Sequence, residues 1–147
     1  MDLRWKAVSN SLKTFKVLQD HASSSISNDG GVYNHWALFI DQPEAETLLN
    51  VRGSDGHFRY ETEKRDVRHD ESLVELVYLC VVNDARAKTI RNIARAIPVH
   101  NEISGWNCQD YVLDLLDELE ERKVIDGEDE VYRLQRTYLA GRQEGLP

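Results

Sequence analysis

Nearly every residue of the segment Leu73–Val82 is apolar, and several carry branched side chains. The run is about half the ~20 residues that a membrane-spanning helix needs. A short apolar run of this kind favours a strand that is buried on both faces. We therefore expect a β-sheet with this segment as its central strand.

The sequence before that run predicts further strands joined by tight turns. Residues 12–21 partly alternate apolar and polar side chains, and 32–40 is rich in aromatic and aliphatic residues. Extended structure is expected again over 47–52, and alternation returns over 57–61 after the turn residues 53–56. Consecutive strands linked by such turns form an antiparallel meander.

Three helices are expected in the second half of the chain. Residues 85–97 show helical spacing after the N-cap candidate Asn83, and the pattern ends at Pro98. A second helix begins at Cys108 after the cap Asn107, and its apolar stripe consists of Cys108, Tyr111, Val112, Leu115, Leu116 and Leu119. A third covers about 128–142, with a thin apolar face made of Val131, Leu134 and Tyr138. Together these elements predict an α+β fold in which one domain spans residues 1–147.

The composition of the chain excludes some classes of function. With 26 acidic against 18 basic residues and a net charge of −8, the chain lacks the basic surface that nucleic acid binding requires. No apolar run approaches a membrane span, and the first residues do not form a signal peptide, so we expect a cytoplasmic protein. Two cysteines do not make a disulfide framework, and scattered histidines favour neither a metal site nor a cofactor; they are His21, His35, His57, His69 and His100.

Cys108 and His35 are the candidate catalytic residues. A thiolate is the reactive form of cysteine, and a helix N-terminus lowers the thiol pKa because unpaired N–H groups point at the sulfur. An imidazole brought near by the fold can take up the proton. Without further context, the simpler interpretation is that Cys108 is a small core residue and His35 a buried strand histidine. Cys80, in the apolar run, is expected to be buried and inert.

The residues around this pair form two motifs that resemble those of a known superfamily. The first motif, on the predicted strand, is His-Trp-Ala-Leu-Phe-Ile at 35–40. The second, at the start of the predicted helix, is Asn-Cys-Gln-Asp-Tyr-Val at 107–112. The order of the two motifs resembles that in the circularly permuted papain-like (NlpC-type) proteins, in particular in the lecithin retinol acyltransferase-like and PPPDE peptidase-like families. A group of fungal proteins has similar motifs. The resemblance covers about residues 32–122. It implies a permuted papain-like fold with Cys108 as nucleophile and His35 as general base.

Such sites also contain a third residue that orients the imidazole. The resemblance places it on the strand after the histidine strand, where the acyltransferase-like proteins have a second histidine and this chain has Asn50. An amide oxygen that accepts from the imidazole N–H would set its tautomer. His57, one strand further on, is the alternative. The amide in place of the histidine makes lipid acyl transfer a less expected activity.

Residues around the pair are candidates for oxyanion or substrate contacts. The backbone N–H of Cys108 is the first oxyanion donor. The second donor stays open, with Tyr33 and Asn34 as candidates. Trp36 either lines the site or fills the core, and Gln109 lies in the first helical turn. Asp110 is expected to cap the helix, since it follows Asn107 by three residues.

The expected function is a thiol-dependent hydrolase that needs no cofactor. Cys108 would attack an amide, isopeptide or ester carbonyl in a small molecule or a peptide, and the resulting thioester would be hydrolysed with His35 as base. Two alternatives stay open: an acyltransferase that uses the same pair, and a non-catalytic interaction module in which Cys108 belongs to the core. The pattern does not determine the oligomeric state.

Overall fold

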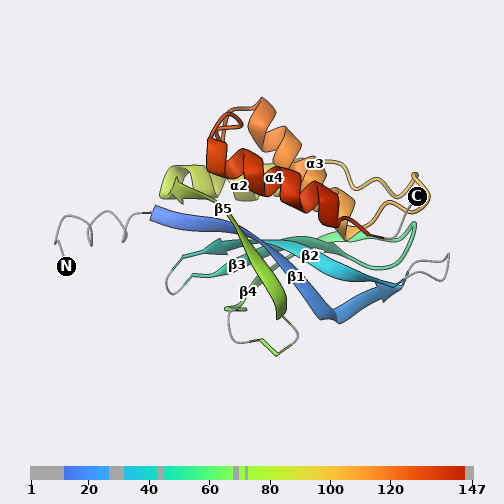
Figure 1. Cartoon of the computed structure of the whole chain (residues 1–147). Coiled ribbons are helices and arrows are strands. Elements are labelled where there is room, and N and C mark those ends of the chain that lie inside the picture. Colours follow the sequence, from blue (N-terminus) through green and yellow to red (C-terminus); the bar gives the residue numbers. More distant parts are fainter. Residues whose placement is uncertain (1–11, 27–31, 43–44, 68–69, 72, 145–147) are drawn as a thin grey trace.

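The computed structural model describes residues 12–26, 32–42, 45–67, 70–71 and 73–144, and it is an α+β fold (Figure 1). One antiparallel sheet carries helices on one of its faces. The strands are β1 (Leu12–Ile26), β2 (Val32–Asp41), β3 (Thr47–Arg52), β4 (Arg59–Lys64) and β5 (Leu73–Asn83). The helices are α2 (Asp84–Ala96), α3 (Cys108–Glu121) and α4 (Glu130–Arg142). Within these ranges, no helix combines the length and the apolar character needed to cross a bilayer.

The sheet has the strand order β4-β3-β2-β1-β5. The predicted meander is confirmed, because β2, β3 and β4 pair with their neighbours in antiparallel fashion. Strand β1 lies between β2 and β5 and extends beyond the predicted segment 12–21. The predicted extended structure from residue 57 begins instead at Arg59.

The prediction that Leu73–Val82 forms the central strand is wrong. The segment is β5, which lies at the edge of the sheet and pairs with β1. Its burial alternates: the inward side chains include Val77, Leu79 and Val82, and the exposed ones include Val74, Tyr78 and Val81. An apolar run alone does not distinguish an edge strand from a central one, since that depends on which distant segments pair with it.

The central strand is β2, and its two faces contribute to different clusters. Trp36, Leu38 and Ile40 belong to the main core between the sheet and the helices. Ala37 and Phe39 belong to a smaller cluster with Leu48 and Val67, since successive side chains point to opposite faces. This double burial explains why β2 is apolar along most of its length.

The two helices that follow β5 are where the sequence predicts them. The side chain of Asn83 caps α2 by accepting from the backbone N–H of Arg86 at 2.8 Å. The predicted apolar stripe of α3 is confirmed, because its members are buried in the main core: Cys108, Tyr111, Val112, Leu115, Leu116 and Leu119. Helix α3 therefore lies along the sheet with its first residue inside the protein.

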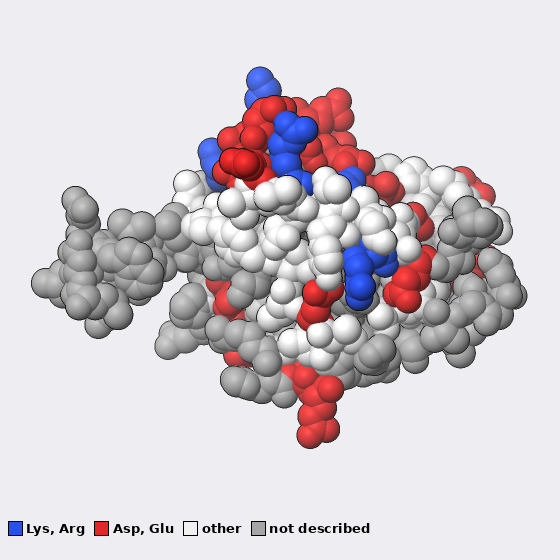
Figure 2. Space-filling model, viewed as in Figure 1, with Lys and Arg blue, Asp and Glu red and all other residues white. Residues whose placement is uncertain are grey.

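Helix α4 has the predicted range but not the predicted face. Val131, Leu134 and Tyr138 are exposed, whereas Tyr132 and Leu139 are buried. The Tyr132 hydroxyl also donates to Oε2 of Glu120 at 2.7 Å, which joins α4 to α3. A stripe of three apolar residues on a polar helix carries little directional information, and tertiary contacts select the other face. Acidic side chains gather over the end of α3 and the start of α4 (Figure 2).

Candidate active site

Helix α3 begins in a reciprocal capping arrangement. The Asn107 side chain accepts from the backbone N–H of Gln109 at 2.8 Å, and the Asp110 carboxylate accepts from the backbone N–H of Asn107 at 2.9 Å. The predictions for Asn107 and Asp110 are therefore confirmed. This capping box holds Cys108 as the first residue of the helix.

The start of α3 lies against β2 where the sheet opens. The pairing between β2 and β3 runs from Ile40 with Thr47 to Leu38 with Leu49, and it ends there. Beyond that point, the Gln109 amide donates to the carbonyl of Asn34 at 2.9 Å. The backbone of Trp36 lies close enough to the Cys108 sulfur to favour its ionised form. The sulfur thus lies beside the residue that follows His35.

The buried imidazole of His35 is paired with Asn50. Its Nε2 lies 2.7 Å from Oδ1 of Asn50, and both side chains are almost fully buried. The Asn50 amide nitrogen donates to the carbonyl of Glu61 on β4 at 2.8 Å, so the amide oxygen faces the imidazole. Because the amide oxygen can only accept, Nε2 is the protonated nitrogen in this contact. The structure brings together His35 and Asn50, which the sequence suggests as base and orienting residue.

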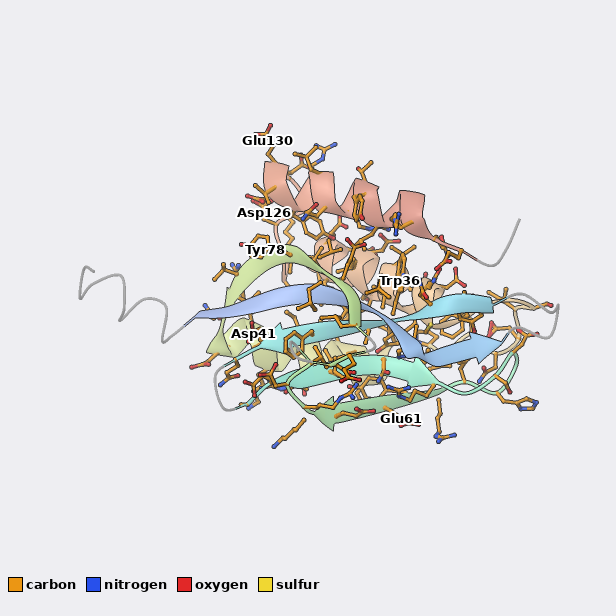
Figure 3. The ribbon with its side chains drawn as sticks, turned by 60° about the horizontal axis from the view of Figure 1, so that its bottom comes forward. Trp36, Asp41, Glu61, Tyr78, Asp126 and Glu130 are labelled. Carbon is orange, nitrogen blue, oxygen red and sulfur yellow. The ribbon has the colours of Figure 1, made fainter. Side chains whose placement is uncertain are left out.

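Strand alternation relates this pair to the sulfur. His35 is two residues from Ala37, and Asn50 is two residues from Leu48, so the pair shares a face with the smaller cluster. Cys108 belongs to the main core on the other face. A reaction between the imidazole and the sulfur therefore requires the two groups to meet where the backbone pairing of β2 and β3 has ended. Figure 3 shows Trp36 on the side of β2 that faces the helices.

The Cys108 sulfur is not ionised in this conformation. The residue is fully buried, and burial raises the pKa of the thiol to about 12. The backbone N–H groups of Trp36, Cys108 and Gln109 contact the sulfur and act in the opposite direction. The expected lowering of the pKa by the helix start is therefore outweighed by desolvation. Cys80 is also a free thiol but half-buried, and burial raises its pKa to about 11.

The remaining predicted residues separate into three environments. His57 is exposed in the turn before β4, where its backbone N–H donates to the carbonyl of Ser54. Tyr33 and Trp36 are buried in the main core, and the Trp36 indole Nε1 has no hydrogen-bond partner among the described residues. Asn34 and Gln109 bind each other beside the sulfur. The structure therefore brings Asn50, and not His57, to the imidazole.

One segment that contacts the candidate site was absent from the sequence-based prediction. The segment Gln143–Glu144, directly after α4, lies on the first turn of α3 and on Asn34. It has no periodic pattern and no recognisable motif, so nothing in the sequence signals this contact. In the part of the chain that the structure describes, no group of three His, Cys, Asp or Glu side chains is arranged to hold a metal ion.

Comparison with known families gives one match. Residues 23–126 match the model of a family of unknown function, DUF6540. The chain belongs to the DUF6540 family. The matched part of this DUF6540 protein includes His35, Asn50 and Cys108, whereas α4 and Glu144 follow it. Searches of curated proteins and of solved structures return no match to the chain.

Proposed function

We propose that this DUF6540 protein is a thiol-dependent hydrolase with a permuted papain-like fold. The observation that carries the proposal is the buried hydrogen bond between His35 and Asn50, on the two strands that contact the helix beginning at Cys108. Nucleophilic catalysis by cysteine requires a base of fixed tautomer that can reach a thiol, and His35 lies on β2, a strand that helix α3 contacts. Two free thiols also suit the reducing cytoplasm, our proposed location.

The chemistry starts from a neutral thiol, since burial raises the pKa of Cys108. As the sulfur attacks the carbonyl carbon of an amide or ester, Nδ1 of His35 takes the thiol proton and an S–C bond forms. The imidazolium then protonates the leaving amine or alcohol while its bond to carbon breaks. Water attacks the thioester with His35 again as base, and the S–C bond breaks to release the acid and the thiol.

Two features support a productive transition state at this position. The backbone N–H of Cys108 lies at the sulfur, where a carbonyl oxygen would become negative after attack. The imidazolium that forms would donate Nε2–H to Oδ1 of Asn50, whose own N–H group is held by Glu61. A buried, oriented acceptor of this kind stabilises the charged ring without being protonated itself.

A non-catalytic interaction module is the competing proposal. The complete burial of Cys108 within the main core is the observation that favours it. An acyltransferase would use the same residues and would differ only in the group that resolves the thioester. Hydrolysis is the simpler outcome, because water needs no binding site of its own.

The experiment compares the two cysteines of the same chain. The native protein, Cys108→Ala and Cys80→Ala are screened against amides, isopeptides and esters, with a chloromethyl ketone as covalent probe. The hydrolase proposal requires turnover in the native and Cys80→Ala proteins and none in Cys108→Ala. Equal turnover in all three proteins would exclude a catalytic role for Cys108, and a thioester released only by an added amine would indicate a transferase.

A further inference from the structure

The segment after α4 is bound to the start of α3 as a peptide ligand would be. The backbone N–H of Glu144 donates to Oε1 of Gln109 at 2.7 Å. Oε1 of Glu144 accepts from the amide of Gln109 and from the backbone N–H of Asn34, each at 3.3 Å. Gln109 thus contacts both a backbone N–H group and a carboxylate of one residue.

A second contact anchors the same segment. The Gln143 amide donates to Oδ1 of Asp110 at 2.7 Å, one residue further along α3. Gln109 is fully buried and is held in place by the carbonyl of Asn34 at 2.9 Å. The side chain of Gln109 that receives the segment is therefore a preorganised, buried polar group, whereas Asn34 and Asp110 are half-buried.

The position of this contact relates it to the sulfur. Asn34 directly precedes His35, and Gln109 directly follows Cys108. The segment therefore touches the chain neighbours of both proposed catalytic residues, while the sulfur itself is fully buried. In Figure 1 the end of α4 and the start of α3 lie at the same end of the molecule. The segment lies outside the matched residues 23–126, so it is an addition to the part that this chain shares with its family.

We propose that Gln143–Glu144 is an internal strap that occupies a binding subsite for an acidic peptide, formed by Asn34 and Gln109, and that its release exposes Cys108. The subsite accepts a backbone N–H group and a carboxylate from the same residue. A ligand peptide with glutamate at the matching position would displace the strap. The inference goes beyond the proposed function, because access to the sulfur can be measured whether or not the thiol is catalytic.

The test measures alkylation of both cysteines by iodoacetamide, resolved by peptide mass spectrometry. The proteins are the native chain, a chain that ends at Arg142, Glu144→Ala, and the control Glu128→Ala on an exposed glutamate before α4. Cys80 is the internal reference, because it lies on β5 and lines a separate pocket with Arg86 and Asp129. Removing the strap after Arg142 leaves the buried Tyr132 and Leu139 of α4 in place.

We expect the chain that ends at Arg142 to label Cys108 about tenfold faster, which corresponds to ~1.4 kcal/mol in the free energy of opening. Glu144→Ala should accelerate the labelling of Cys108 less, since the backbone hydrogen bond from residue 144 to Gln109 remains. Glu128→Ala should not change the labelling rate. The Cys80 rate should not change in any of them. Equal Cys108 rates in the native, shortened and Glu144→Ala chains would overturn the strap.

A second arm tests the peptide subsite. The synthetic peptide Arg-Gln-Glu-Gly-Leu-Pro, residues 142–147 of this chain, is added to the chain that ends at Arg142. It should restore slow labelling of Cys108, and the same peptide with alanine for glutamate should not. Equal effects of the two peptides would refute recognition of the carboxylate. Fast labelling of Cys108 without turnover of any substrate would support the strap and count against the hydrolase.

Discussion

Nε2 of His35 and Oδ1 of Asn50 lie 2.7 Å apart on neighbouring strands, beyond the point where those strands pair through their backbones. The side-chain bond joins β2 and β3 where their backbone pairing has ended. It therefore has two effects that can be separated: it satisfies buried polar groups in the sheet, and it orients the imidazole.

Replacing Asn50 by alanine should affect stability and activity together. The imidazole N–H and the Glu61 carbonyl would lose their partners in a buried region, which costs about 1–3 kcal/mol in the free energy of unfolding. If the hydrolase proposal holds, turnover should fall about tenfold or more, since a general base contributes ~10²–10⁴-fold and the tautomer would no longer be set. Urea denaturation and initial rates measure the two effects.

The matched control for Asn50 is Thr62→Val on the adjacent strand. The Thr62 hydroxyl donates to the Leu48 carbonyl at 3.0 Å, so this change also removes a bond between β3 and β4. It should lower stability by about 1 kcal/mol or less and leave turnover unchanged. A similar loss of turnover in both variants would show that the sheet, and not the imidazole, is what Asn50 supports.

The caps of α2 and α3 offer a second comparison. Asn107→Ala and Asn83→Ala each remove a side chain that accepts from a backbone N–H of the first turn, and each should lower the free energy of unfolding by about 1 kcal/mol. Only Asn107→Ala should change the rate of Cys108 alkylation, because Asn107 holds the turn that contains the sulfur. An identical change in Cys108 reactivity from Asn83→Ala would indicate general loosening instead.

Burial of Cys108 predicts a loss of stability at alkaline pH. Its pKa is raised to about 12 in the folded state, whereas an unfolded thiol ionises near ~8.5. The contribution is complete below pH ~8.5 and is lost as the pH rises toward the folded pKa, because only the unfolded state releases the proton. At pH ~10 the loss from this thiol is about 2 kcal/mol. Unfolding midpoints at pH 7, 9 and 10 under reducing conditions measure it.

Cys108→Ala is the comparison that isolates this effect from other titrating groups. In a Cys80→Ala background, the additional Cys108→Ala change should make the decline between pH ~8.5 and ~10 shallower by about 2 kcal/mol. An unchanged slope would mean that the sulfur is accessible to water or already ionised in the folded protein, contrary to the burial described above.

Two glycines should respond to alanine in opposite directions. Gly53 has φ +139° in the turn between β3 and β4, and an added Cβ would lie 2.4 Å from the His57 carbonyl oxygen, so Gly53→Ala should destabilise by more than about 1 kcal/mol. Gly141 is helical with open space around it, and Gly141→Ala should stabilise by about 0.5–1 kcal/mol. Thermal midpoints should move by ~2–4 °C per kcal/mol. A rise for Gly53→Ala would contradict the turn geometry.

Local patterns in the sequence were sufficient to place most of the helices and strands. The turn after β3, the caps Asn83 and Asn107, and the stripe of α3 are determined by residues within a few positions of each other, and the structure has them as expected. The suggestion of Asn50 came from the family resemblance, which places the orienting residue on the next strand, and the contact with His35 is present. Its catalytic role stays a prediction.

Only the tertiary structure decided the properties that depend on distant segments. Whether Leu73–Asn83 lies at the edge or the centre of the sheet depends on which strands pair with it. The buried face of α4 depends on Glu120 and other residues of the layer beneath it. The thiol pKa depends on how much of the protein surrounds the sulfur, and the strap depends on where α4 ends in space. Caps and periodicity act over a few residues, whereas burial and solvent access are set by contacts that the whole fold creates.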